Sequence, residues 1–515
     1  MAGITAADLE RHMEKISGIG SVSGPFELNS LKSKVSGTEK KEKNSSKMVS
    51  SLEEAIRRTG LKNGQTISFH HHFRDGDYIV NMVIDKLAKM GFKDLVLASS
   101  SLSDCHAPLI EHIKNGVIKR IESSGLRGKL ADEISRGLMD IPVVFRSHGG
   151  RAYAIETGGL QIDVAFLGAP SCDPAGNANG YCRDIDDAVM CGSMGYAKCD
   201  AQYARNTIIL TNNIVPFPNV PFGIPGSDVD YIVKVDEIGN PAGIMKGATR
   251  FTTNPKELVI AELASDVIEA SGILTDGFSF QTGTGGASLA VTRFLRERMI
   301  NKKITAGFAL GGITGSIVDL YEEGLVKKLL DVQSFDLRAA QSLKNNRFHH
   351  QISAELYASP KSGGAAVNFL DVVVLSATEV DVDFNVNVLT GNDGIIRGAV
   401  GGHQDTAYGA AVTIVVCPLT RGRIPCLVDR VGTIVTPGKT VDVLVSEYGV
   451  SVNPLRTDLK EKFTAARIPL RSMDEFKAMV EAAVGRPDPI QYADKVVGVV
   501  SYRDGSVIDL IRQVK

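Results

Sequence analysis

Two stretches of this chain share one pattern, and that pattern decides the fold. Residues 68–100 read SFHHHFRDGDYIVNMVIDKLAKMGFKDLVLASS, and residues 279–312 read SFQTGTGGASLAVTRFLRERMINKKITAGFALGG. Each begins with a short apolar strand, passes through a polar or glycine-rich loop into apolar residues at helical spacing, and ends in a second strand. Strands that alternate with helices in this way are typical of a parallel sheet covered by helices. The sequence therefore predicts an α/β protein.

Two further blocks extend the match. APLIEHIKNGVIKRI, from Ala107, resembles GSIVDLYEEGLVKKL, from Gly315, and DVAFLGAPSCDPAGNANG, from Asp163, aligns in the same register with DVVVLSATEVDVDFNVN, from Asp371. Three matched blocks in one order indicate a duplicated unit. We expect an N-terminal extension and polar linker over residues 1–50, a first α/β domain over 51–250 and a second over 251–515, with the active site in the cleft between the domains at the carboxyl ends of the strands.

Composition excludes several classes of protein. The chain has 515 residues, with 57 Lys and Arg against 59 Asp and Glu, a net charge of −2. A balanced charge argues against nucleic acid or an anionic membrane as partner. The N-terminus reads as neither a signal peptide nor a transit peptide, no apolar run reaches the length of a membrane span, and the seven cysteines lack CxxC pairs. We therefore expect a cytoplasmic enzyme without a metal site. The 52 glycines indicate tight turns and close backbone approaches.

The loops after the two matched strands are candidate parts of the cleft. Residues 70–74 read HHHFR, and three consecutive histidines cannot all point one way, so a three-histidine metal site is geometrically poor. His70 or His72, with Arg74, is better suited to donate to a carboxylate-rich ligand, although a turn packed by its neighbours explains the run equally well. The corresponding loop, QTGTGG from Gln281, resembles an anion cradle but lacks the Walker GK[ST] and the GxGxxG spacing.

The densest glycine cluster, GIIRGAVGGHQDTAYGAA, begins at Gly394 and precedes a very apolar strand. Adjacent N–H groups at Gly401 and Gly402 could form an oxyanion hole, with His403 and Asp405 orienting the loop. A glycine-rich bend between strands is the alternative. The chain has no GxSxG elbow and no HExxH motif, so a serine hydrolase or a zincin has no support.

The sequence resembles a known family, the coenzyme A transferases and acyl-CoA hydrolases. GAVGGHQDTAYGAA is similar to the GxGGxxDxxxGA signature of that superfamily, and SATEVDVDFNVN, VDVLVSEYGVSVNP and QTGTGG fit the same family. With the HHHFRDGD loop and DPAGNANG included, the chain most resembles the citrate:acetyl-acyl-carrier transferases, the citrate lyase alpha-subunit family. The resemblance spans essentially the whole chain. It implies two tandem Rossmann-like (NagB/RpiA-like) domains with largely parallel sheets.

The resemblance implies a reaction and one departure from the superfamily. The implied reaction turns acetyl-acyl carrier protein and citrate into citryl-acyl carrier protein and acetate. It uses no permanently bound cofactor, and coenzyme A or a phosphopantetheine arm serves as co-substrate. Superfamily members that form a glutamyl thioester carry their nucleophile where this chain has Gly315. Glycine cannot form a thioester, so we expect transfer in a ternary complex, through a mixed anhydride. The implied partners are the acyl carrier and lyase (beta) subunits and further copies of this chain.

Site residues follow from motif and chemistry together. We expect Gly401 and Gly402 to donate to the oxyanion, and the citrate carboxylates to contact basic side chains. The thioester or coenzyme A arm is expected at Gly283, Thr284, Gly285, Gly286, Gly398 and His403. The candidates for citrate are His72, Arg74, Arg151 and Arg183.

Two rivals remain open. The chain could be a sister enzyme, such as an acetate or 4-hydroxybutyrate CoA-transferase or an acyl-CoA hydrolase, with Glu379 or Glu156 as nucleophile. It could also act mainly as a structural platform for the lyase and carrier subunits, with residues 1–50 as a docking arm.

Overall fold

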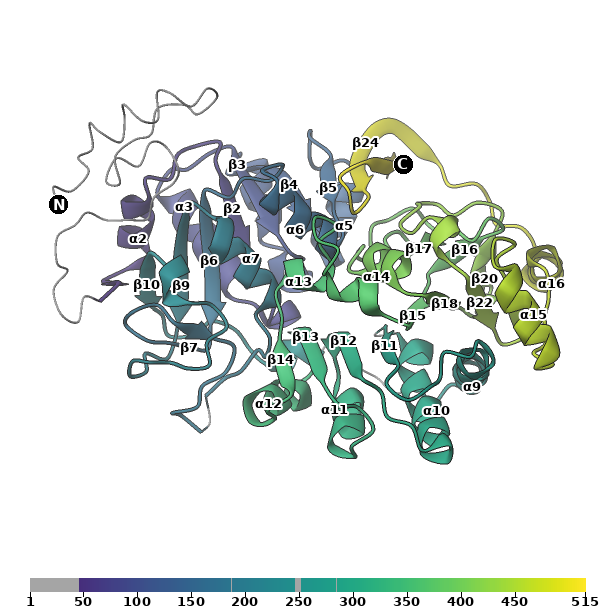
Figure 1. Cartoon of the computed structure of the whole chain (residues 1–515). Coiled ribbons are helices and arrows are strands. Elements are labelled where there is room, and N and C mark those ends of the chain that lie inside the picture. The colour runs from purple at the N-terminus through teal and green to yellow at the C-terminus, as the bar shows by residue number, and fades with distance from the viewer. Residues whose placement is uncertain (1–45, 187, 246–251, 284) are drawn as a thin grey trace, which may run out of the picture. The chain divides into compact units, whose positions relative to one another are not determined.

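The fold is built on two large sheets joined in one chain (Figure 1). This computed structural model describes residues 46–186, 188–245, 252–283 and 285–515. Most of the predicted extension therefore lies outside the described residues. From Lys47 onwards the described residues form one compact unit.

The first sheet has ten strands in the order β1-β10-β9-β6-β2-β3-β4-β5-β24-β25. All neighbours pair parallel except the final pair, β24 and β25. Its strands are β1 (Met48–Val49), β2 (Thr66–Phe69), β3 (Leu95–Ser99), β4 (Ile118–Ser123), β5 (Val143–Phe145), β6 (Val164–Ala169), β9 (Asn206–Thr211), β10 (Tyr231–Lys234), β24 (Tyr492–Ser501) and β25 (Val507–Val514). The helices between them are α2 (Leu52–Thr59), α3 (Ile79–Lys89), α4 (Leu109–Lys114), α5 (Gly128–Ser135), α6 (His148–Glu156), α7 (Gly195–Tyr203) and α8 (Ala242–Met245).

The second sheet has eight strands in the order β14-β13-β12-β11-β15-β18-β22-β23, parallel except for the last pair. Its strands are β11 (Ser279–Thr282), β12 (Phe308–Ile313), β13 (Leu329–Ser334), β14 (His349–Gln351), β15 (Val372–Ser376), β18 (Val412–Val416), β22 (Val443–Ser446) and β23 (Gly449–Val452). Its helices are α9 (Pro255–Ala270), α10 (Gly286–Lys302), α11 (Gly315–Glu322), α12 (Leu337–Asn345), α13 (Ala354–Ala358), α14 (His403–Gly409), α15 (Thr457–Ala465) and α16 (Met473–Val484).

Short strands and single turns complete the elements. A three-stranded sheet joins β16 (Glu379–Asp381), β17 (Val386–Asn387) and β21 (Leu427–Val428), and two hairpins pair β7 (Ser171–Cys172) with β8 (Ala178–Asn179) and β19 (Thr420–Arg421) with β20 (Ile424–Pro425). The 3-10 turns are η1 (Arg74–Gly76), η2 (Asp104–His106), η3 (Gly226–Asp228), η4 (Ala366–Phe369) and η5 (Gly438–Thr440).

The predicted duplication is confirmed by strand order. The run β10-β9-β6-β2-β3-β4-β5 of the first sheet matches β22-β18-β15-β11-β12-β13-β14 of the second, strand for strand. The loops repeat as well. The carboxylate of Asp173 accepts from the Asn177 side-chain amide at 2.8 Å, and that of Asp381 accepts from Asn385 at 3.2 Å. The mixed α/β fold with largely parallel sheets is as predicted.

The chain termini depart from the predicted domain limits. β24 pairs with β5 of the first sheet, although residues 251–515 were expected to form the second domain; Figure 1 shows the yellow β24 beside β5. Strand order depends on long-range pairing, which local periodicity does not encode. At the other end, Met48–Val49 pairs with β10, so the last residues of the expected 1–50 linker belong to the sheet.

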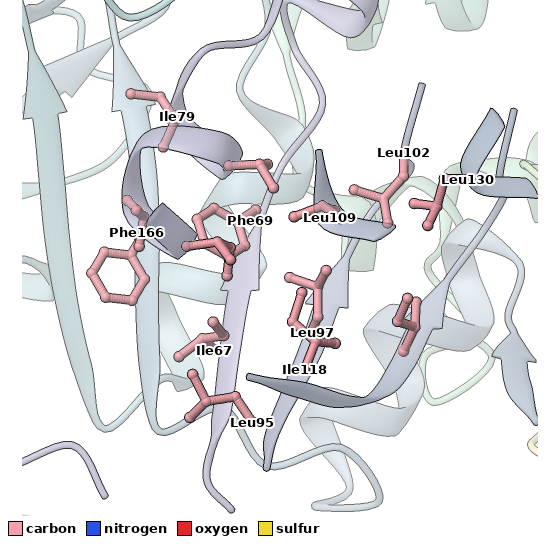
Figure 2. Close-up of a cluster of buried hydrophobic side chains, with 14 of the residues drawn as sticks. Ile67, Phe69, Ile79, Leu95, Leu97, Leu102, Leu109, Ile118, Leu130 and Phe166 are labelled. Atoms are coloured by element: carbon pink, nitrogen blue, oxygen red, sulfur yellow. The ribbon is translucent and has the colours of Figure 1, made fainter. Parts of the chain in front are cut away.

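Apolar residues of strands and helices fill the core of the first sheet. Phe69 of β2 stacks on Phe166 of β6 with ring centroids 5.6 Å apart, and Leu97 of β3 packs in the same cluster (Figure 2). Helix α3 covers this cluster with one apolar face that includes Ile79 and Val83. The packed core fixes the strand ends from which the site is built.

Candidate active site

A cavity of about 340 Å³ lies where the carboxyl ends of the two sheets meet. Loops from both halves of the chain line it, as the fold rule for parallel sheets predicts. The first half contributes His71, Arg74, Ser101, Ser103, Ser124, Arg127, His148 and Tyr196. The second contributes Gln281, Thr282, Gly283, Gly285, Gly312, Val332, Gln333, Phe335, Tyr357, Leu375, Ser376, Val388, Ala399, Val400, Gly401, Gly402 and His403. The two halves therefore form one site together.

The predicted oxyanion loop lies on the wall of this cavity. Gly401 has φ +57°, in the left-handed region, and its carbonyl accepts from the His148 backbone N–H at 2.9 Å. Gly402 lies against Tyr357, so close that a Cβ at Gly402 would lie 2.3 Å from the tyrosine Oη. Within the described chain, the N–H groups of Gly401 and Gly402 make no hydrogen bond. Two adjacent donors thus remain available to a ligand.

Buried polar contacts hold this loop in place. The carboxylate of Asp405, in α14, accepts from the Ser147 hydroxyl at 3.0 Å and from the Gly149 N–H at 2.9 Å. Arg503, which follows β24, lies 3.4 Å from the same carboxylate. His403 bonds Thr436 Oγ1 at 2.7 Å. The C-terminal hairpin therefore supports the glycine loop, and Asp405 and His403 make contacts of the kind expected of residues that orient it.

The predicted thioester-binding glycines divide into two groups. Gly283 and Gly285 line the cavity, whereas Gly286 begins α10 and does not. Thr284 lies outside the described residues. Gly398 is also absent from the described lining; its carbonyl accepts from the Leu126 N–H at 3.1 Å, so it ties the loop to the first half of the chain.

Two positively charged side chains, those of Arg74 and Arg127, line the cavity. The guanidinium of Arg74 stacks over Phe335 at 5.0 Å, and neither Arg74 nor Arg127 forms an ion pair with any residue in the described ranges. Burial, reinforced by the charge of Arg127, lowers the pKa of Arg74 to about 10, so Arg74 stays protonated near neutral pH; burial also lowers the pKa of Arg127. Arg74 also has φ +54°, a strained conformation of the kind that clusters at functional sites. The pair therefore presents two guanidinium groups without an ion-pair partner in the described ranges, and guanidinium groups are chemically suited to pair with carboxylates.

Three predicted citrate-binding residues do not reach this cavity. His72 is 1% exposed and its ring lies 3.6 Å from that of His70. Arg151 forms a buried bidentate pair with Asp200, at 2.5 and 2.8 Å. Arg183 lies on the surface, where its guanidinium donates to a backbone carbonyl. Desolvation and neutralisation by an acid distant in sequence explain why the first two are unavailable.

Sequence reasoning missed the aromatic wall of the cavity. Tyr196 packs against His71 at 5.3 Å and against His148 at 4.4 Å. Burial lowers the pKa of His71 well below its usual value and that of His148 to about 3, so both imidazoles are neutral near pH 7. The signal that could have found His71 is that neighbouring side chains in a histidine run cannot all point one way; in the structure the His70 and His72 rings lie together, 3.6 Å apart, and His71 lines the cavity. Arg127 had no comparable sequence signal.

No aspartate or glutamate is among the described residues that line the cavity. Glu379 accepts from Asn387 at 3.0 Å and lines a different cavity, and Glu156 accepts from Ser359. Gly315 begins α11, where its N–H donates to Asp336 at 2.7 Å. Both glutamates of the rival mechanism therefore lie outside the cavity. No cluster suited to a metal ion occurs among the described residues.

Comparison with known proteins shows the family of the chain. The family model for the citrate lyase alpha subunit (CitF) matches residues 45–514. The chain belongs to the citrate lyase alpha-subunit family. The citrate lyase alpha chain of Klebsiella pneumoniae is 59% identical over 92% of either chain, and that of Escherichia coli (strain K12) is 58% identical over 91% of either chain. The activity of the family is that of the citrate coenzyme A or acyl-carrier transferase component of citrate lyase.

Solved structures place the fold in the same family. The putative alpha subunit of citrate lyase from Streptococcus mutans, solved in complex with citrate, has a TM-score of 0.89 at 57% identity, with 93% of either chain covered. The malonate decarboxylase alpha subunit of Acinetobacter baumannii, with a TM-score of 0.62 at 14% identity and 86% of either chain covered, shares the fold. The predicted CoA-transferase-like architecture is confirmed. No helix in the described ranges is both long and apolar enough to cross a bilayer.

Proposed function

We propose that the chain exchanges acetyl for citryl on a carrier thiol, in a ternary complex and without an acyl-enzyme. The observation that carries this proposal is the lining of the cavity. Among the described residues the cavity wall has two unpaired arginines and two free glycine N–H groups, and it has no carboxylate that could act as a nucleophile. The citrate named in the Streptococcus mutans complex fits such a receptor.

Two acyl transfers complete the reaction. A citrate carboxylate oxygen attacks the acetyl carbonyl, and the C–S bond breaks. The carrier departs as a thiolate, and a mixed anhydride of acetate and citrate forms. The thiolate then attacks the citryl carbonyl, the anhydride C–O bond breaks, and acetate leaves. No proton is transferred, because the attacking group is already ionised.

The side chains of the cavity have separate roles in this scheme. Arg74 and Arg127 hold citrate carboxylates, since guanidinium groups pair with carboxylates through two hydrogen bonds. The N–H groups of Gly401 and Gly402 donate to the oxyanion of each tetrahedral intermediate, and one such donor typically contributes about 3 kcal/mol. Gly283 lies beside the carrier arm.

The neutral wall protects the intermediate. His71 and His148 lack charge near pH 7 because burial lowers their pKa values, and the ring of Tyr196 packs against both. A wall of neutral aromatic rings excludes water that would otherwise hydrolyse the anhydride. Good positioning of thioester and carboxylate contributes up to roughly 7–11 kcal/mol of the barrier reduction.

We further propose that the co-substrate is an acyl carrier protein or coenzyme A thioester, that the chain assembles with carrier and lyase subunits and with copies of itself, and that it works in the cytoplasm. The family name "alpha subunit" supports assembly with other subunits. Residues 1–50, of which 1–45 lie outside the described ranges, are a candidate docking arm.

A trapping experiment tests the absence of an acyl-enzyme. The chain is incubated with an acetyl thioester alone, then treated with borohydride or hydroxylamine and digested for mass spectrometry. We expect no glutamyl adduct. An adduct at Glu379 or Glu156 would overturn the ternary-complex mechanism and favour a sister CoA-transferase.

The platform alternative has a separate test. Purified chain, assayed alone with citrate and acetyl-coenzyme A, is expected to form citryl thioester. Turnover that requires the other subunits and survives a bulky replacement of Gly402 would support a platform role instead.

A further inference from the structure

A second cavity of about 440 Å³ opens between the two halves of the chain, away from the active site. Arg183 and Lys198 of the first half line it, as do Arg347 and His350 of the second. It shares no lining residue with the active-site cavity. We call it the basic groove, because no aspartate or glutamate is among its described lining residues.

The cations of the basic groove have no acidic partner. None of Arg183, Lys198, Arg347 and His350 forms an ion pair with a residue in the described ranges. Burial lowers the pKa of Lys198, and the charge of Glu355 opposes this effect; burial in turn raises the pKa of Glu355. The positive charge of Arg183 and Arg347 is therefore not neutralised within the described ranges, and a concave site lets it attract anions more strongly than a convex surface would.

The two guanidinium groups are held in place without being neutralised. Arg183 stacks over Tyr181 at 5.4 Å and donates to the carbonyl of Lys344 at 2.7 Å. Arg347 stacks over the ring of Phe348 at 5.5 Å. An aromatic ring orients a guanidinium while leaving most of its N–H groups for a ligand. Because the side chains are already ordered, they lose less conformational entropy when an anion binds.

The side chains of Lys198 and His350 lie close enough to interact electrostatically. Burial and then the charge of Lys198 lower the pKa of His350. A bound anion would relieve this repulsion and would pair with groups on both sides of the groove. Because Arg183 and Lys198 come from one half of the chain and Arg347 and His350 from the other, a ligand with two linked anionic groups can contact more of these side chains than a single ion can.

We propose that the basic groove binds a small polyanion with two linked anionic groups, which Arg183, Lys198, Arg347 and His350 contact together. Diphosphates and dicarboxylates both have this chemistry. The proposal does not rest on the proposed transferase mechanism, because the active-site residues take no part in it.

Calorimetric titration of the full chain with pyrophosphate tests the proposal. The variants are Arg183→Gln combined with Arg347→Gln, the matched control Arg296→Gln on an exposed helix face, and Arg74→Gln in the active site. Loss of two charge-assisted contacts is expected to weaken binding by at least about tenfold in the double variant. Both Arg296→Gln and Arg74→Gln are expected to bind within about twofold of the parent.

Two results would overturn the proposal: no pyrophosphate binding at millimolar concentration, or binding that is lost with Arg74→Gln and kept in the double variant. Malonate as a competitor separates the ligand sources. Displacement of pyrophosphate identifies dicarboxylates as ligands, and failure to displace it identifies diphosphates; either result supports the groove.

The titration of His350 gives a readout that needs no variant. In an NMR titration the pKa of His350 is expected to rise when pyrophosphate is present, because a nearby anion stabilises the protonated ring. An unchanged pKa at saturating pyrophosphate would place the ligand elsewhere and contradict the proposal.

Discussion

Replacing Gly402 with alanine tests the geometry of the proposed oxyanion site. Gly402 has φ −92°, which alanine adopts without strain, so the effect of the substitution is steric. The new Cβ would lie 2.3 Å from Tyr357 Oη, whereas ordinary contact begins at 3.4 Å. Tyr357 is buried and its Oη accepts from Gln281 at 3.1 Å, so the loop or the ring must move by roughly 1 Å.

A shift of that size is large for a catalytic group. Misplacement by about 1 Å can cost about 100-fold in rate, and losing one oxyanion donor costs about 100- to 1,000-fold. We therefore expect Gly402→Ala to lower kcat by about 100-fold or more. KM for citrate should change much less, because Arg74 and Arg127 are untouched. Steady-state transfer between an acetyl thioester and citrate measures both constants.

Two controls separate this effect from general destabilisation. Gly158 has φ +81°, and a Cβ added there would have no other atom within 4 Å, so Gly158→Ala should cost about 1–2 kcal/mol of stability with kcat unchanged. Combining Gly402→Ala with Tyr357→Phe removes the closest atom and leaves ring carbons at 3.2 Å, so at least about tenfold of the loss should return relative to Tyr357→Phe alone. A folded Gly402→Ala enzyme with parental kcat would refute the reasoning.

Three further predictions concern charge and burial. Arg127→Gln should raise KM for citrate by about tenfold or more with a smaller change in kcat, as initial rates would show, and equal KM values would remove Arg127 from the citrate site. The folded-state pKa of His148 is lowered to about 3, so the fold is most stable above the unfolded pKa of about 6.5, where the ring is neutral, and the free energy of unfolding decreases as pH falls from about 6.5 towards about 3. Urea unfolding should show that His148→Gln loses less of its unfolding free energy over this range than the parent does. Identical pH slopes for the two proteins would contradict the burial argument. Arg503→Ala leaves the buried carboxylate of Asp405 without its cation and should cost about 3–5 kcal/mol in the same assay, while a cost below about 1 kcal/mol would show that the pair is not structural.

The duplicated fold was readable from sequence because its signals are local. The matched segments beginning at Ser68 and Ser279 form the central strands of the two sheets, each flanked by equivalent neighbours. The glycine loop at Gly401 and Gly402 was also found, since closely spaced glycines mark close backbone approach. Both features depend on residues adjacent in the chain.

The missed features depend on residues far apart in the chain. Arg151 is a predicted citrate ligand, but in the folded chain its guanidinium pairs with Asp200, which is distant in sequence. No sequence motif marks Arg127. Its turn lies beside the glycine loop, where Gly125 pairs with Ala399. The placement of β24 next to β5 likewise follows from tertiary pairing, which overrides local pattern.

Oxygen transfer in a single turnover tests most directly whether the citrate carboxylate itself attacks the thioester. The chain, in excess over the acetyl thioester, is mixed with citrate labelled with ¹⁸O in its carboxylates, and the released acetate is analysed by mass spectrometry. Direct attack leaves one citrate oxygen in the acetate, so the first acetate released should carry ¹⁸O. If a glutamate of the protein were the nucleophile, the first acetate would be unlabelled and the label would appear on the protein, which would contradict the mechanism.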